Sequence, residues 1–149
     1  MNVAIIGSGS WATALAKIVM HNATDINWYI RKQETIDEFV EIRRNPNHLE
    51  WAYFDVSRIH FSADINAVIE QSDLLVLAVP SPYLKQSLND IKVDMSNKMV
   101  ISAVKGMIPD ENLLVTEYMH QYFQVPKENL GVIAGPCHAE EIALERLSY

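Results

Sequence analysis

The sequence of 149 residues contains a single cysteine, no cluster of lysine and arginine, and no apolar run long enough to cross a membrane. The lone Cys137 excludes a disulfide within the chain and is typical of proteins kept in a reducing compartment. The longest apolar run, Leu74 to Pro80, falls short of half a membrane span. These scarcities exclude a disulfide-rich scaffold and a membrane-spanning helix in this sequence.

Positive charge is also scarce, because 12 lysines and arginines face 19 aspartates and glutamates, for a formal net charge of −7 and an isoelectric point near 5.1. We therefore expect no nucleic-acid partner and no insertion into a membrane, and any bound phosphate must be held by local groups. The first residues show no basic segment followed by an apolar one, so we expect no signal peptide and a soluble, cytoplasmic protein.

Hydrophobic residues make up 49% of the chain and charged residues 21%, which is the balance of a globular protein. A chain of this length is sufficient for one domain with a sizeable core. No repeat, linker or low-complexity tract divides it, so we expect a single domain over residues 1–149.

The most informative stretch lies near the N-terminus, where the uncharged run Val3–Ile6 precedes Gly7-x-Gly9-x-x-Ala12 and an Ala/Leu-rich segment. The run predicts a buried strand and the segment predicts a helix, so the glycines lie at a strand-to-helix turn. Gly7 permits the tight turn, Gly9 lets the backbone approach a pyrophosphate, and Ala12 lets the helix pack closely on the strand. The N–H groups at the helix start suit an anion. We expect a dinucleotide site here, with a plain tight turn as the alternative.

Strand and helix patterns alternate along the chain, and no hairpin signal is present. The expected strands are Val3–Ile6, Ile26–Ile30, Ile59–Phe61, Leu74–Val79, Met99–Ala103 and Val132–Ala134. The expected helices are Ala12–His21, Glu34–Arg43, 62–69, Tyr83–Leu88, Glu111–Tyr122 and His138–Leu147. Residues 48–58 have no clear period and are expected to form a long connection. This order predicts the α/β class, with a Rossmann-like, doubly wound, mostly parallel sheet and helices on both faces.

Ligands bind such a sheet at the carboxyl ends of its strands, beside the point where the strand order reverses. Arg31 and Lys32 follow the second strand, where an NAD-specific site usually offers an acid to the ribose 2′-hydroxyl. Two cations there suit a 2′-phosphate, and Arg31 can also stack on adenine, so NADP is a candidate cofactor beside NAD. The alternative is that both are solvated charges at a strand end.

Further candidates follow the later strands. Pro80 opens the rigid segment 80–82, which either lies along the cofactor or forms a structural turn. Lys105, followed by a glycine that lets the loop turn sharply, points to the same crevice and suits a substrate phosphate. Residues 135–141 begin another helix, whose start suits an anion.

The cysteine and histidine in that last loop are weak candidates for chemistry. Cys137 and His138 are neighbours on the chain, which rarely face each other, so we expect no nucleophile–base pair. His138, Glu140 and Glu141 lack the spacing of a zinc helix, and we expect no metal site.

The three tryptophans are expected to differ in role. Trp28 and Trp51 are expected to pack in the interior. Trp11 lies inside the glycine-rich turn and is expected to cover the nicotinamide end of a cofactor.

Four blocks of sequence, taken together, carry a family resemblance. They read Gly-Ser-Gly-Ser-Trp-Ala-Thr-Ala-Leu-Ala at 7–16, Leu-Ala-Val-Pro-Ser at 77–81, Ser-Ala-Val-Lys-Gly at 102–106 and Gly-Pro-Cys-His-Ala-Glu-Glu at 135–141. In this order they resemble the N-terminal cofactor-binding domain of NAD(P)-dependent glycerol-3-phosphate dehydrogenase. The resemblance implies reversible reduction of dihydroxyacetone phosphate to sn-glycerol 3-phosphate, which feeds glycerophospholipid synthesis. It also implies a homodimer for the full-length protein.

The resemblance implies roles for single residues as well. Together with the residues of the glycine turn and the loops described above, it gives the following expected cofactor contacts: Gly7, Gly9, Ser10, Trp11, Arg31, Lys32, Pro80, Lys105 and Ala139. The expected substrate contacts are Lys105, Gly135 and Cys137. The chain departs from the family where Ala12 replaces glycine and where Cys137-His138 replaces Ser-Phe, which turns a hydroxyl contact into a thiol or backbone contact. Residues 48–51 replace a Tyr-Leu-Pro-Gly type of sequence, so no role is carried onto that loop.

Two other interpretations stay open on the sequence. One is another Rossmann dehydrogenase, ketopantoate reductase-like or 6-phosphogluconate dehydrogenase-like, which substrate screening of the full-length protein would separate. The other is a non-catalytic nucleotide-sensing domain, which a natural product ending near Tyr149 or continuing into a DNA-binding segment would favour.

The resemblance places the family's proton-donating lysine in a helical domain beyond Tyr149, so we expect no catalytic residue in this chain. Hydride transfer leaves an alkoxide that needs an acid within about 3 Å. The 149-residue chain is therefore expected to bind NADP or NAD weakly or moderately and to show no turnover. Loss of NADPH absorbance with dihydroxyacetone phosphate checks this, with a full-length family member as positive control, and measurable reduction by the chain alone would contradict it.

Overall fold

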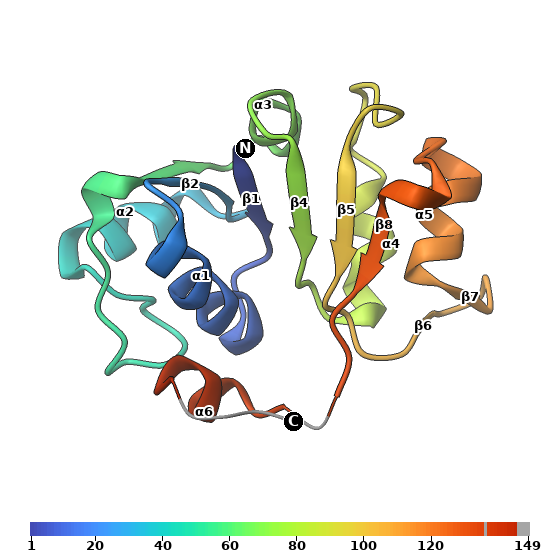
Figure 1. Ribbon diagram of the computed structural model, residues 1–149. Coiled ribbons are helices and arrows are strands. Elements are labelled where there is room, and N and C mark those ends of the chain that lie inside the picture. The colour runs from blue at the N-terminus through green and yellow to red at the C-terminus, as the bar shows by residue number, and fades with distance from the viewer. Residues whose placement is uncertain (136, 146–149) are drawn as a thin grey trace.

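Parallel pairing of six strands forms the centre of the molecule in a computed structural model, which describes residues 1–135 and 137–145 (Figure 1). The strands are β1 (Val3–Ile6), β2 (Ile26–Tyr29), β3 (Ile59–Ser62), β4 (Leu74–Leu77), β5 (Met99–Ser102) and β8 (Leu130–Val132). They lie in the order β3-β2-β1-β4-β5-β8, and every pair is parallel. The order reverses between β1 and β4, which places a ligand crevice at their carboxyl ends.

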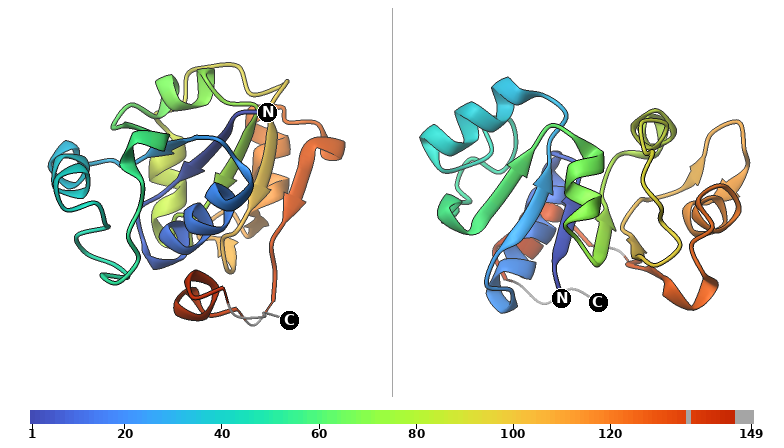
Figure 2. Two further views of the ribbon diagram at one scale, coloured as in Figure 1. Left: turned by 60° about the vertical axis from the view of Figure 1, so that its left-hand side comes forward. Right: turned by 90° about the horizontal axis from the view of Figure 1, so that it is seen from above.

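Helices cover both faces of this sheet (Figures 1 and 2). They are α1 (Ser10–Asn22), α2 (Gln33–Ile42), α3 (Ile65–Glu70), α4 (Ser81–Leu88), α5 (Val115–Phe123) and α6 (Ala139–Ala143), with short 3₁₀ turns η1 (Val56–Arg58) and η2 (Lys127–Asn129). Successive residues of β1 enter different cores, because Ile5 packs with α1, α2 and α6 whereas Ala4 and Ile6 pack with α3, α4 and α5. The doubly wound α/β fold predicted from the sequence is confirmed.

Four sequence expectations about elements are wrong: the absence of a hairpin, the start of α5, the position of the last strand and the start of α4. Residues 107–114 contain an unpredicted antiparallel pair, β6 (Met107–Ile108) with β7 (Leu113–Leu114), and α5 therefore begins at residue 115 rather than at 111. Asp110 and Asn112 make this turn with φ of 68° and 53°, a left-handed conformation that these two residue types tolerate. The last strand lies at 130–132 rather than 132–134. α4 begins at Ser81 rather than at Tyr83, because the first helical turn accepts Pro82, whose missing N–H would be unpaired there anyway.

The last predicted helix is only partly covered. α6 spans Ala139–Ala143 and packs on α1, where His21 Nε2 lies 2.7 Å from Glu145 Oε1. Residues 146–149, which the prediction included in part, lie outside the described residues. No helix among the described residues is long and apolar enough to cross a bilayer.

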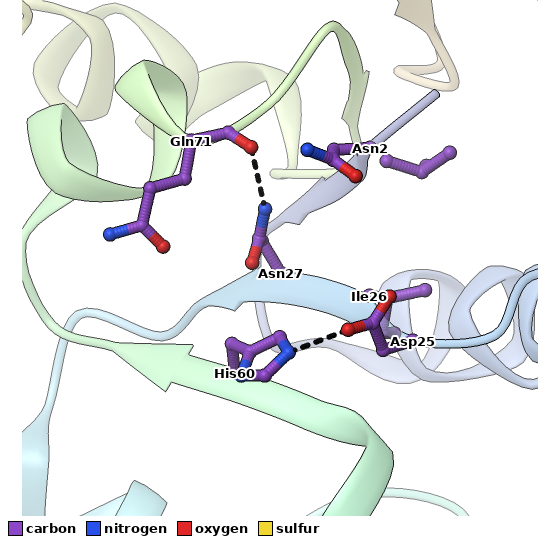
Figure 3. A pocket seen from close by; sticks show the side chains of 7 residues that line it. Asn2, Asp25, Ile26, Asn27, His60 and Gln71 are labelled. Carbon is purple, nitrogen blue, oxygen red and sulfur yellow. Dashed lines mark hydrogen bonds and ion pairs between the residues drawn. The ribbon is translucent and has the colours of Figure 1, made fainter.

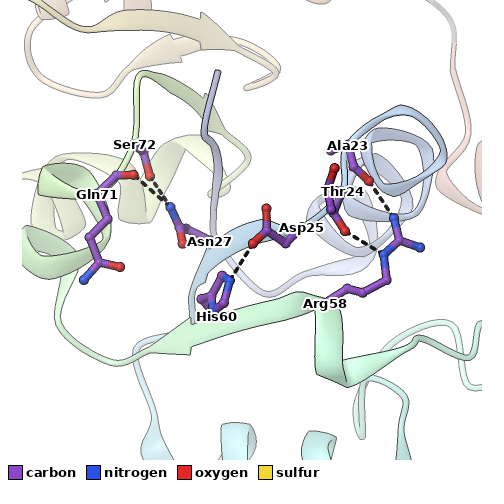
Figure 4. Close-up of polar contacts among 8 residues, drawn as sticks. All are labelled: Ala23, Thr24, Asp25, Asn27, Arg58, His60, Gln71 and Ser72. Carbon is purple, nitrogen blue, oxygen red and sulfur yellow. Dashed lines mark hydrogen bonds and ion pairs between the residues drawn. The ribbon is translucent and has the colours of Figure 1, made fainter.

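The amino ends of the strands are held by side chains that bond to backbone (Figure 4). Arg58, which precedes β3, donates to the carbonyls of Thr24 at 2.7 Å, Met20 at 2.8 Å and Ala23 at 2.6 Å, so it satisfies the orphan carbonyls at the end of α1. Asn27, in β2, is buried and donates to the Gln71 carbonyl and to Ser72 Oγ at the end of α3.

Removing the Arg58 guanidinium is expected to destabilise the fold. Arg58→Ala leaves three carbonyls at the end of α1 without their donor, which should lower the free energy of unfolding by about 1–3 kcal/mol. Urea denaturation followed by circular dichroism measures this. Arg31→Ala, which removes an exposed arginine, is the matched control and should change the free energy by less than about 0.5 kcal/mol. Equal stability of the two variants would contradict the capping role.

Candidate functional site

The carboxyl ends of β1, β4 and β5 and the start of α6 surround one cavity of about 400 Å³. It is lined by Gly9, Ser10, Trp11, Ala78, Val79, Pro80, Ser81, Pro82, Ala103, Val104, Lys105, Cys137, His138 and Ala139. Seven of the predicted site residues thus lie together, although the sequence separates the first and last of them by well over a hundred positions. Lys105 lies on the same side of the sheet edge as Gly9, as the dinucleotide hypothesis requires.

The two glycines of the turn differ in whether the structure leaves room for a side chain. Gly7 has a φ of +126°, and a Cβ built on it would lie 2.7 Å from the carbonyl oxygen of Ala78, so only glycine lets β1 and the end of β4 approach this closely. Gly9 has an ordinary φ of −77°, and a Cβ there would meet nothing within 4 Å. The space in front of Gly9 is therefore open, which fits the approach of a ligand to the backbone.

The start of α1 is suited to an anion. Gly9 is the N-cap, and the first turn contains no acidic residue. The first N–H groups of a helix have no acceptor within it and carry the positive end of the helix dipole. An α1 of 13 residues thus presents unpaired donors to the cavity.

A tryptophan of the first turn of α1 and a lysine from the loop after β5 form one wall of the cavity. The indole Nε1 of Trp11 donates to the Ala103 carbonyl at 2.8 Å, which fixes the ring across the cavity wall. Lys105 Nζ lies 6.0 Å from the centre of that ring and donates to the Cys137 carbonyl at 3.2 Å. The ammonium group is the positive charge of this cavity wall, in a position to pair with a phosphate.

A second cavity of about 400 Å³ adjoins the first and shares Trp11, Lys105 and Cys137 with it. Gly135, with a φ of +143°, lines this second cavity. Exposed apolar side chains complete its rim, at Met107, Leu114, Val132 and Ile133. The three predicted substrate contacts therefore surround one hollow.

Arg31 and Lys32 lie just outside these cavities. Both are exposed and follow β2, whose end is joined to the turn by the Gly7 N–H donating to the Tyr29 carbonyl at 3.2 Å. Neither of them lines the first or the second cavity. This is the place, next to the glycine turn, where the sequence analysis expects a ribose group.

The sequence analysis missed two residues that touch the glycine turn. Asn45 is fully buried and donates to the Ser8 carbonyl, and His48 Nδ1 lies 3.1 Å from Ser10 Oγ. Both belong to the connection after α2, to which no role was carried. In the sequence, Asn45 is only a polar residue after a helix, and nothing there indicates its contacts with Ser8 and Thr13, more than thirty residues away. Trp51 is 44% exposed, contrary to the prediction that it packs in the interior, whereas Trp28 is buried as expected.

Another hollow, of about 370 Å³, lies at the opposite, amino edge of the sheet (Figure 3). Three of its polar side chains are paired: His60 Nε2 lies 2.8 Å from Asp25 Oδ2, and Asn27 donates to the Gln71 carbonyl. None of the predicted site residues lines it. In the described part of the chain, no group of three His, Cys, Asp or Glu side chains could hold a metal ion.

The chain matches the family model described as "NAD-dependent glycerol-3-phosphate dehydrogenase N-terminus" over residues 2–149. The chain belongs to this family. The match selects the glycerol-3-phosphate dehydrogenase interpretation over the other dehydrogenases left open by the sequence.

Relatives within the family share sequence and fold with this domain. It is 30% identical over 144 residues to "Glycerol-3-phosphate dehydrogenase [NAD(P)+]" of Oceanobacillus iheyensis, covering 95% of this chain and 41% of that protein. The structure of Plasmodium falciparum glycerol-3-phosphate dehydrogenase is similar at 28% identity with a TM-score of 0.84, covering 99% of this chain and 44% of that one. The yeast Saccharomyces cerevisiae enzyme shares the fold, with a TM-score of 0.85 at 22% identity and coverage of 99% and 45%. The chain thus spans less than half the length of these relatives.

Proposed function

We propose that this chain is the dinucleotide-binding part of an NAD(P)-dependent glycerol-3-phosphate dehydrogenase, which interconverts dihydroxyacetone phosphate and sn-glycerol 3-phosphate. The observation that carries the proposal is the single cavity that joins the open backbone at Gly9 to the ammonium group of Lys105. Family membership and the names of the relatives support the same conclusion.

The residues present fit a dinucleotide. Gly9, Ser10 and Trp11 begin α1 and would hold the diphosphate with their N–H groups, because no side chain at Gly9 fills the space in front of them. When bound, the nicotinamide supplies or accepts a hydride. Pro80 and Ala139 lie in the walls of the same cavity and would flank the cofactor.

Lys105 would serve the substrate side of the reaction. Its ammonium group lies where both cavities meet, so it can attract a phosphorylated substrate to the cofactor. The Cys137 carbonyl accepts from this ammonium group and holds it between the two cavities, while Gly135 leaves room at the rim. At Cys137, where the chain departs from the family, the contact with Lys105 is thus made by the backbone carbonyl.

The proposal assigns completion of the active site to a second, helical domain of the whole protein. The apolar rim of the second cavity is the surface that such a domain would cover, since exposed apolar patches commonly mark contact surfaces. The whole protein is proposed to be a cytoplasmic homodimer that serves glycerophospholipid synthesis.

The two glycines of the turn give a matched test of the cofactor site. Gly9→Ala is expected to lower the free energy of unfolding by about 1 kcal/mol or less, because its methyl group meets open space and the only cost is the poorer N-capping of alanine. It should weaken NADPH or NADH binding by about tenfold or more, because that space is where the diphosphate lies. Gly7→Ala should instead destabilise the fold by about 2 kcal/mol or more, through its positive φ and its contact with Ala78.

Fluorescence titration with each dinucleotide and thermal unfolding of both variants separate the two effects. Unchanged affinity in Gly9→Ala would contradict the cradle. Absence of any dinucleotide binding by the unsubstituted chain would overturn the proposed function itself.

The cations after β2 predict a preference between the two cofactors. Substituting both Arg31 and Lys32 by alanine should lower the affinity for NADPH about tenfold, because charged hydrogen bonds to the 2′-phosphate are lost. The affinity for NADH should fall far less. The control is the double alanine variant of Lys92 and Lys127, which removes the same charge from segments that precede β5 and β8 at the amino edge. An NADH preference in the unsubstituted chain would refute the 2′-phosphate role.

A further inference from the structure

Three successive carbonyls of the glycine turn each accept a hydrogen bond from a side chain of the protein interior. Trp28 Nε1 donates to the Gly7 carbonyl at 2.7 Å, Asn45 Nδ2 to the Ser8 carbonyl at 2.9 Å, and Thr13 Oγ1 to the Gly9 carbonyl at 2.8 Å. All three donor residues are fully buried, at 0% exposure.

These contacts, together with the Thr13 N–H that donates to the Gly9 carbonyl at 3.0 Å, determine where the N–H groups of the turn point. A trans peptide unit is planar, and its C=O and N–H groups point in opposite directions. No described peptide bond is cis. Holding the carbonyls of residues 7, 8 and 9 inward therefore turns the N–H groups of residues 8, 9 and 10 outward. A carbonyl that turned outward would present its negative end to an anion instead.

Two of these donors, Asn45 and Thr13, are also hydrogen-bonded to each other. Asn45 Nδ2 donates a second bond, at 2.9 Å, to Thr13 Oγ1, and its Oδ1 accepts from the Asn47 N–H at 3.0 Å. The Thr13 hydroxyl thus accepts a hydrogen bond from Asn45 and donates one to the Gly9 carbonyl. An amide that donates twice and accepts once fits this position, and an aliphatic side chain makes none of the three bonds.

The third donor is held by an aromatic cluster. The Trp28 ring contacts Phe39, Phe54 and Phe61, with centroid distances of 5.3, 5.6 and 5.7 Å. Phe54 belongs to the same connection as Asn45, and its N–H donates to the Arg43 carbonyl at 2.9 Å. The connection after α2 therefore supports the glycine turn at two points, through its amide and through its packing on the indole.

We infer that Thr13, Trp28 and Asn45 are positioning residues, which aim the N–H groups of the glycine turn at the diphosphate of the cofactor by holding its carbonyls inward. The inference rests on the proposed function, because it concerns the same cofactor site. None of the three residues lines the cavity, so each acts through the backbone.

Thr13 offers the sharpest test, because its side chain can keep its shape and lose its hydroxyl. Thr13→Val removes the side-chain donor of the Gly9 carbonyl and the acceptor of the second Asn45 N–H, so it should loosen the turn and weaken NADPH binding about tenfold. Thr13→Ser keeps the hydroxyl and should stay within about twofold of the unsubstituted chain. Fluorescence titration of the 149-residue chain measures both. A purely structural hydroxyl would change thermal stability in the valine variant and leave its affinity for NADPH unchanged.

Two buried asparagines supply the second test. Asn45→Leu removes the donor to the Ser8 carbonyl, and Asn27→Leu removes a comparable buried donor at the amino edge of the sheet, as Figures 3 and 4 show for Asn27. Both should lower the melting temperature. Only Asn45→Leu should weaken NADPH binding, by about tenfold, with Asn27→Leu within about twofold.

The outcomes separate the inference from the function on which it rests. Equal NADPH affinity in Thr13→Val, Thr13→Ser and the unsubstituted chain overturns the positioning role and leaves the proposed function standing. Equal weakening by Asn45→Leu and Asn27→Leu also overturns it, because the loss then follows stability alone. No dinucleotide binding by the unsubstituted chain overturns both. The Thr13 pair decides the question if Asn45→Leu does not fold.

Discussion

The close approach of Gly7 to the carbonyl of Ala78 is the constraint on which this structure depends. It lets β1 and β4 lie side by side where the strand order reverses, and it sets the separation of the loops that follow them. The open backbone at Gly9 and the proline loop at residue 80 then face each other across a cavity rather than filling it. A side chain at position 7 would separate these loops before any ligand arrived.

The site combines rigid and apolar surroundings with very few charges. Its walls come from strand ends and helix starts, and Lys105 is the one lysine or arginine among the residues lining the first cavity in the described chain. In a protein of net charge −7, a phosphate has to be attracted by such a local arrangement. The acid-free first turn of α1 and the ammonium of Lys105 approach the cavity from two sides, which suits a ligand with a negative charge at more than one place.

The sequence was sufficient to predict the features that follow from hydrophobic periodicity or from residues close together in the chain. Strand periodicity and the glycine spacing predicted the parallel sheet and the cavity edge, and the Lys105 loop followed from the strand order. The support beneath the glycine turn could not be predicted, because Asn45 meets Ser8 and Thr13 only after two strands have paired. The β6–β7 pair was not predicted, because strands of two residues show no hydrophobic period. The left-handed turn residues between the two strands fall instead at the start of the predicted helix.

The three tryptophans lie in three distinct surroundings. Trp11 forms part of the cavity wall, Trp28 is sealed beneath the glycine turn, and Trp51 is largely open to water. Each indole should therefore fluoresce differently. Emission from Trp11 would respond to a ligand in the cavity, and emission from Trp28 would respond to a change in the backbone above it. The exposed Trp51 is accessible to quenchers in the solvent, which would separate its emission from that of the other two.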